Sequence, residues 1–274
     1  VPGGVQMLGR LMKYEIKATG RIFLPLYGLI LAFAGLNRLF MYFNLQKKSD
    51  FLPNFVSGIS MLVYILLVAA AFVITLVVTV QRFRKNLLGD EGYLSFTLPV
   101  AVHSHIDSKM IVSLMWSVLS TVVALLSVAI LAIGSGLYRE IASGWDSVRD
   151  FFSQYGASGW GCVVSIVVLL LAAQLSGILS LYVSVVVGNL SGRHKRLAGF
   201  GTFLGIGVIA QVVFFSFANT SGVFQSYHDV PLDSVAQMRA LSTDCLILAV
   251  FCAAFGVAFY FLTDWMLSRK LNLE

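Results

Sequence analysis

Six long runs of apolar residues constrain this chain more than any other feature of its sequence. The hydrocarbon core of a bilayer is about 30 Å thick, so a helix needs about 20 apolar residues to cross it. Six segments meet that length with few charges: 22–43, 55–80, 111–133, 163–187, 197–217 and 245–267. The sequence therefore predicts an all-α, polytopic membrane protein with six transmembrane helices.

The composition supports the same fold class. Charged residues make up 12% of the chain, about half of the 25% typical of a soluble domain. We expect residues 7–274 to form a single six-span domain. Met7 is interpreted as the initiator, so residues 1–6 are interpreted as an added remnant.

The distribution of basic residues predicts the orientation of the spans. Of the 19 Lys and Arg residues, 13 fall in the two terminal segments and the loops after spans two and four, and 6 fall on the opposite side. Because cytoplasmic loops carry the excess of positive charge, we expect both termini in the cytoplasm of a multi-pass protein of the cell membrane. A five-span arrangement with 197–217 re-entrant would place the C-terminus outside. The net charge of +6 is then a topology signal, and no nucleic-acid partner is expected.

Two segments outside the spans have amphipathic helical patterns. In the first, apolar residues recur at helical spacing and basic residues take the remaining faces. The apolar residues are Leu8, Leu11, Met12 and Ile16, and the basic residues are Arg10, Lys13 and Lys17. This pattern predicts a helix that lies in the cytoplasmic interface. In the second, apolar residues step by three and four: Leu137, Ile141, Trp145, Val148, Phe152 and Tyr155. We expect a helix on the outer surface of the membrane, bent near Gly144.

The loop "KNLLGDEGYLSFTLPVAVHSHIDSKM", which runs from Lys85 to Met110, has a pattern of its own. Asp90 and Glu91 favour the start of a short helix, and Pro99 ends it. Its apolar contacts come from Tyr93, Leu94, Phe96 and Leu98. A helix this short is marginal in water, so we expect a partner to hold it.

Several chemical motifs are absent from the sequence. There is no G-x-x-x-x-G-K-[ST] phosphate loop, H-E-x-x-H or G-x-S-x-G, so we expect no enzyme activity, catalytic residue, cofactor or metal on this chain. His103 and His105 are interpreted as solvated loop residues. The run "GFGTFLGIG" lies inside span five, where small residues are explained by close helix packing. Cys162, Cys245 and Cys252 are interpreted as small buried apolar residues.

A few polar side chains lie within the spans. Gln174, Gln211 and Arg38 are the candidates for lining a substrate pathway. For Gln174, a hydrogen bond that links two helices is an equally good interpretation. Arg38 is near the outer end of its span, where a structural role is favoured over substrate contact.

Taken together, these features resemble the membrane-spanning subunits of type-2 ABC transporters, the bacterial ABC exporter permeases. "MLGRLMKYEIKATGR" looks like the connecting helix of that family, and "RKNLLGDEGYLSFTLPVAVHSHIDSKMI" looks like its coupling helix. The latter is similar to small permeases of Gram-positive bacteria that export peptide toxins, antimicrobial peptides or phenol-soluble modulins. Many relatives have Arg or Ser where this chain has His103 and His105.

The resemblance implies a set of partners. A separate ATP-binding subunit would carry ATP and Mg and contact Asp90, Glu91, Tyr93, Leu94, Phe96 and Leu98. A second permease subunit, identical or a paralogue, would complete a dimer, and the cargo would be an amphipathic peptide or another hydrophobic substrate that enters from the membrane lipid. The alternatives are a membrane scaffold or immunity factor that moves no substrate, and a carrier that works without ATP.

Overall fold

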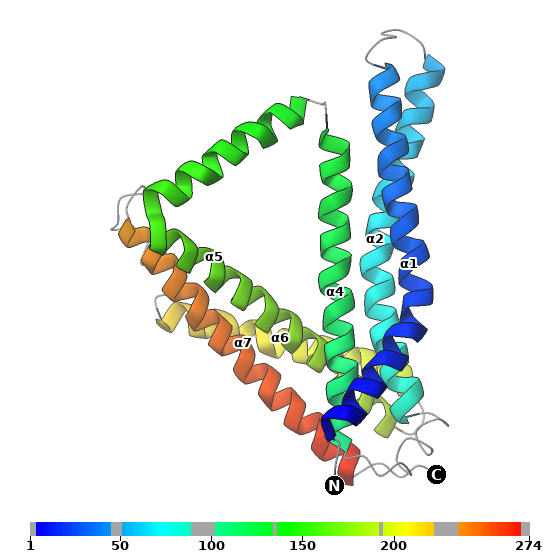
Figure 1. Ribbon diagram of the computed structural model, residues 1–274. Helices are drawn as coiled ribbons and strands as arrows, with labels where there is room; N and C mark the ends of the chain where they lie inside the picture. The colour runs from blue at the N-terminus through cyan, green and yellow to red at the C-terminus, as the bar shows by residue number, and fades with distance from the viewer. Residues whose placement is uncertain are drawn as a thin grey trace. The chain divides into compact units, whose positions relative to one another are not determined.

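The computed structural model describes residues 4–44, 51–88, 102–133, 136–191, 194–221 and 235–269, in which all regular structure is helical. The helices are α1 (Gly4–Asn44), α2 (Phe51–Leu88), α4 (Val102–Ala132), α5 (Gly136–Leu190), α6 (Lys195–Ser221) and α7 (Val235–Arg269) (Figure 1). Each of the six predicted spans lies within one of them, except that the third extends one residue beyond Ala132. All six are long and apolar enough to cross a membrane, which confirms the predicted all-α membrane fold class.

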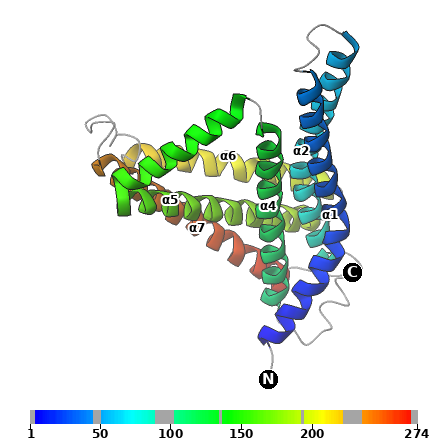
Figure 2. The same ribbon diagram turned by 45° about the horizontal axis from the view of Figure 1, so that its top comes forward.

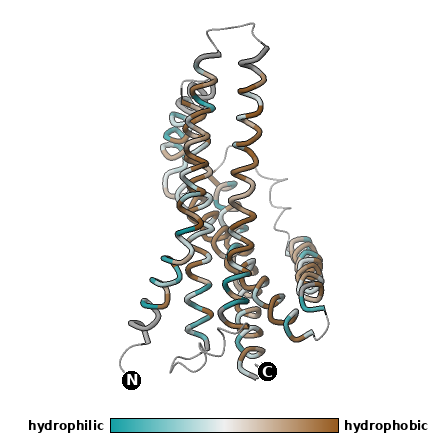
Figure 3. The backbone as a smooth tube through the Cα atoms, turned by 90° about the vertical axis from the view of Figure 1, so that its right-hand side faces the viewer, coloured by the Kyte–Doolittle hydropathy of each residue, from teal (hydrophilic) through white to brown (hydrophobic). Residues whose placement is uncertain are grey.

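The apolar surface of these helices faces outward. At most 33% of the most apolar stretch of any helix is buried within the chain, and for α6 the share is 0%. In Figure 3, the paired α1 and α2 are hydrophobic along most of their length, and hydrophilic residues gather near the N-terminus. Exposed apolar surface on this scale is unfavourable in water and suits contact with lipid.

The chain forms two compact units. The first contains residues 1–81 and 107–146, and the second contains residues 82–106 and 147–274. α2, α4 and α5 each have residues in both units.

The core of the first unit lies between α1, α2 and α4. The Phe23 ring of α1 stacks on the Trp116 ring of α4, with centroids 4.6 Å apart. Met12 and Ile16 pack against the same core, whereas Lys13 and Lys17 are exposed. The predicted apolar face of the N-terminal segment is thus present at these positions, and its place in the membrane interface stays a prediction.

The N-terminal segment is not a separate helix. It continues without a break into the first span as part of the 41-residue α1. Pro25 lies inside α1, where a proline cannot donate the hydrogen bond to the preceding turn and favours a kink. The first part of α1 runs at an angle to the remainder (Figures 1 and 2).

In the second unit, α5 is interrupted at Gly156. This glycine has φ 49° and ψ −123°, a conformation that residues with a side chain rarely adopt. The predicted bend near Gly144 is wrong, because the helix is continuous there. Across the break, the Phe152 ring stacks on the Trp160 ring, with centroids 4.3 Å apart.

The α5–α6 hairpin is closed by two glycines. A Cβ added at Gly188 would lie 2.7 Å from the backbone of Gly199, and one added at Gly199 would lie 3.2 Å from the carbonyl oxygen of Ser184. Of the glycines in "GFGTFLGIG", only Gly199 has such a contact. Added Cβ atoms at Gly201, Gly205 and Gly207 would have no neighbour within 4 Å, so within the described chain the packing explanation holds for Gly199 alone.

We expect Gly188→Ala to destabilise the protein by about 1–3 kcal/mol, because the new methyl group meets backbone that cannot rotate away. Gly201→Ala is the matched control, since its Cβ enters open space. Thermal unfolding of the purified variants in detergent measures the difference. Equal melting temperatures for the two variants would contradict a backbone contact at Gly188.

Candidate functional site

The predicted coupling residues lie outside the described residues. These are Asp90, Glu91, Tyr93, Leu94, Phe96 and Leu98. The structure does describe the two segments that flank them, residues 82–88 at the end of α2 and residues 102–106 at the start of α4. Both belong to the second unit, and we call them the foot segments.

The foot segments are firmly packed. The Phe83 ring stacks on the Tyr182 ring of α5, with centroids 4.0 Å apart and an interplanar angle of 11°. Both side chains are completely buried, as are Leu87 and Ile106. Arg84 and Lys85 are exposed. Both foot segments therefore contain completely buried apolar side chains, and the α2 segment contacts α5 through Phe83.

The two histidines differ in their environment. His103 is exposed, as predicted for a solvated residue, but His105 is buried at 5% exposure. The prediction for His105 is wrong because α4 begins at Val102 and already turns this side chain inward. Among the residues that the structure describes, no group of three His, Cys, Asp or Glu side chains could hold a metal ion.

A buried ion pair links α1 to α4 in the first unit. Lys109 Nζ donates to Glu15 Oε1 at 2.5 Å, and the two side chains are 6% and 13% exposed. One turn further along α1, Thr19 Oγ1 accepts a hydrogen bond from Trp116 Nε1 at 2.7 Å. Sequence reasoning missed this pair. The available signal was a carboxylate at position 15, on the same side of the helix as Met12 and Ile16.

The candidate pathway residues are divided between the two units. Gln174 and Gln211 both lie in the second unit with exposed side chains. Arg38 belongs to the first unit; it is half-buried, and its Nη1 has no hydrogen-bond partner among the described residues. Their role in a pathway stays a prediction.

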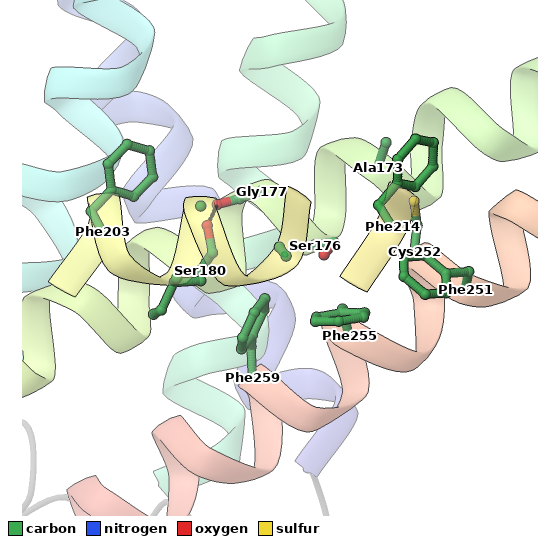
Figure 4. Close-up of a pocket in the computed structure, with 13 residues that line it drawn as sticks. Ala173, Ser176, Gly177, Ser180, Phe203, Phe214, Phe251, Cys252, Phe255 and Phe259 are labelled. Atoms are coloured by element: carbon green, nitrogen blue, oxygen red, sulfur yellow. Dashed lines mark hydrogen bonds between the residues drawn. The ribbon is translucent and has the colours of Figure 1, made fainter. Parts of the chain in front are cut away.

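A cavity of about 270 Å³ lies between α5, α6 and α7 (Figure 4). Small residues of α5 form one wall, and α6 and α7 form the others with five phenylalanines among their residues. The lining consists of Ala173, Ser176, Gly177, Ser180, Phe203, Ile206, Gly207, Ala210, Phe214, Phe251, Cys252, Phe255 and Phe259. We call it the aromatic slot. Within the described part of the chain, no charged residue lines it, and neither does Gln174 or Gln211. The sequence signal for it was the four-residue spacing of the phenylalanines of α7.

Two of the three cysteines have the burial that their interpretation as small buried apolar residues predicts. Cys162 and Cys245 are buried free thiols, and Cys252 is half-buried, with a place in the lining of the aromatic slot.

No protein-family model, curated protein or solved structure matches this chain.

We expect Lys109→Met to destabilise the protein by about 3–5 kcal/mol, because it removes the cation that pairs with the largely buried Glu15 carboxylate. The double variant Glu15→Met/Lys109→Met should recover most of the loss, since two apolar side chains of similar length can replace a buried pair. Unfolding of both single variants and the double variant in detergent completes the cycle. A double-variant loss equal to the sum of the single losses would show that the two residues are not coupled.

Proposed function

We propose that this chain is the membrane-spanning subunit of an ATP-driven exporter. A separate ATP-binding subunit, which carries ATP and Mg, docks on the loop between the foot segments. The observation that carries this proposal is the buried base of that loop, where Phe83 stacks on Tyr182 with both rings completely covered.

A rigid base is what a loop needs if it is to transmit movement. Close-packed interiors are poorly compressible and transfer strain to their neighbours. A displacement of the loop would therefore move α5 through the Phe83–Tyr182 contact.

The sequence of the loop suits a docking surface. The loop supplies apolar side chains from Tyr93, Leu94, Phe96 and Leu98, and negative charge from Asp90 and Glu91. Aromatic anchors in desolvated pockets dominate the energy of many protein interfaces, and charges orient them. Exposed Arg84 and Lys85 flank this surface on α2.

The proposed substrate is an amphipathic molecule that partitions into the membrane. The apolar outer surface of the helices supports a hydrophobic cargo. The choice of a peptide rests on the family resemblance. A second copy of this chain, or a paralogue, completes the proposed transporter.

Affinity purification of this chain from native membranes in mild detergent is the direct test. We expect it to recover a stoichiometric partner that contains a phosphate loop and hydrolyses ATP. Recovery of the chain with no nucleotide-hydrolysing protein would favour a scaffold or an ATP-independent carrier instead.

The variant Tyr93→Ala/Phe96→Ala should release the ATP-binding subunit, because it removes two aromatic anchors. Removal of such residues costs about 2 kcal/mol or more each, so binding should fall more than tenfold while membrane insertion is unchanged. The matched control is Tyr42→Ala/Phe55→Ala, which makes the same two changes at exposed positions of α1 and α2. Titration of the ATP-binding subunit onto nanodisc-embedded variants measures the loss. Equal affinities for both double variants would contradict docking at this loop.

Phe83→Leu should weaken coupling without preventing assembly. It keeps an apolar side chain, so we expect a stability loss of less than about 1.5 kcal/mol, but it removes the stacked ring. Export of a fluorescent amphipathic helical peptide per ATP hydrolysed should fall in proteoliposomes. Phe261→Leu, at a position 65% exposed, should leave that ratio unchanged. Identical ratios would indicate that the stack does not transmit movement.

A further inference from the structure

The lining of the aromatic slot is mostly apolar, and its hydroxyl groups are those of Ser176 and Ser180. Five phenylalanine rings from α6 and α7 lie opposite small residues of α5. The Ser180 hydroxyl donates its proton to the Gly177 carbonyl oxygen at 2.8 Å within its own helix, so it is already paired. A ligand in this slot gains apolar contacts and is offered no charge.

The slot follows the helix axes. Along α6 its lining extends from Phe203 to Phe214, which corresponds to about 16 Å at 1.5 Å per residue. The rings of Phe255 and Phe259 project from α7 toward α6 (Figure 4). A volume of about 270 Å³ lies below the range of about 300–1,000 Å³ that is usual for drug-sized ligands. These dimensions suit a single extended chain of atoms.

The slot is accessible at the depth of the hydrocarbon core. All of its lining lies inside the spans 163–187, 197–217 and 245–267. Gly177 and Gly207 are exposed, and a Cβ added at either would have no neighbour within 4 Å. Because glycine has no side chain, these two positions leave the slot open toward its surroundings. At this depth in the membrane the surroundings are acyl chains.

We propose that the aromatic slot binds one hydrocarbon chain of a membrane lipid. A peptide segment is a poorer occupant, because the lining offers little to pair with backbone N–H and C=O groups, and unpaired groups of this kind are costly in a membrane. This inference does not depend on the proposed export function.

Photo-crosslinking with a phosphatidylglycerol that carries a diazirine in the middle of one acyl chain tests the proposal. The full chain is placed in nanodiscs of phosphatidylglycerol and phosphatidylethanolamine, and adducts are mapped by mass spectrometry. We expect adducts on Cys252, Phe255 and Phe259 to exceed those on Val208 and Ile209. The latter are more than 60% exposed on α6 and report contact with bulk lipid.

Gly207→Leu and Gly205→Leu form the matched pair of variants. Both positions are on α6 with open space around an added Cβ, but only Gly207 lines the slot. Adducts on α7 should fall about tenfold in Gly207→Leu, because the new side chain fills the space that the acyl chain occupies. They should be unchanged in Gly205→Leu. Gly177→Leu fills the slot from α5 and should lower the adduct yield on α7 in the same way. Two independent slot-filling variants ensure that the result does not depend on one variant that fails to fold.

Two outcomes would overturn the proposal. One is equal adduct yield on α7 in wild type and in both slot-filling variants. The other is labelling of Cys252, Phe255 and Phe259 by a diazirine-bearing amphipathic helical peptide but not by the lipid, which would assign the slot to peptide.

Discussion

Buried hydrogen bonds between α1, α2 and α4 fix the packing of the first unit. Apolar side chains gain little by leaving lipid for protein, so they specify helix register weakly. Polar pairs specify it well. Tyr27 shares a hydrogen bond of 2.7 Å with Ser120, which shares one of 3.0 Å with Thr75. Tyr64 and Ser127 form another pair at 2.8 Å. The Glu15–Lys109 ion pair lies at one end of this series, so it sets where the amphipathic segment of α1 meets α4.

The second unit is held together differently. Its helices approach closely at small residues, as at Gly188 and Gly199 between α5 and α6, and at Gly256, whose added Cβ would lie 3.7 Å from Ser176 between α7 and α5. Aromatic rings fill the wider spaces, including the stacked Phe217 and Phe251. Such packing leaves gaps where small residues face large rings. The aromatic slot is one of these gaps, so it follows from the same packing that holds the unit together.

Much of this fold could be predicted from sequence because length and hydropathy alone determine which segments can span a bilayer. The helical spacing of Leu11, Met12 and Ile16 likewise indicated the buried side of α1. Other features depend on residues far apart in the chain. Three of these features are the burial of His105, the ion pair of Glu15 with Lys109, and the aromatic slot. None of them can be predicted without knowing which helices are neighbours. The break at Gly156 rather than Gly144 depends on a backbone conformation that both glycines permit and only one adopts.

The foot segment of α2 and the aromatic slot share one stretch of α5. Tyr182 contacts the foot segment through Phe83, and Gly177 and Ser180 line the slot. Along a helix, five residues span only about 7.5 Å. A shift of α5 at Tyr182 would therefore move the small-residue wall of the slot against the rings of α6 and α7. The two proposals together imply that binding of lipid in the slot and binding of the ATP-binding subunit affect each other. By thermodynamic linkage, each ligand must change the affinity for the other by the same factor.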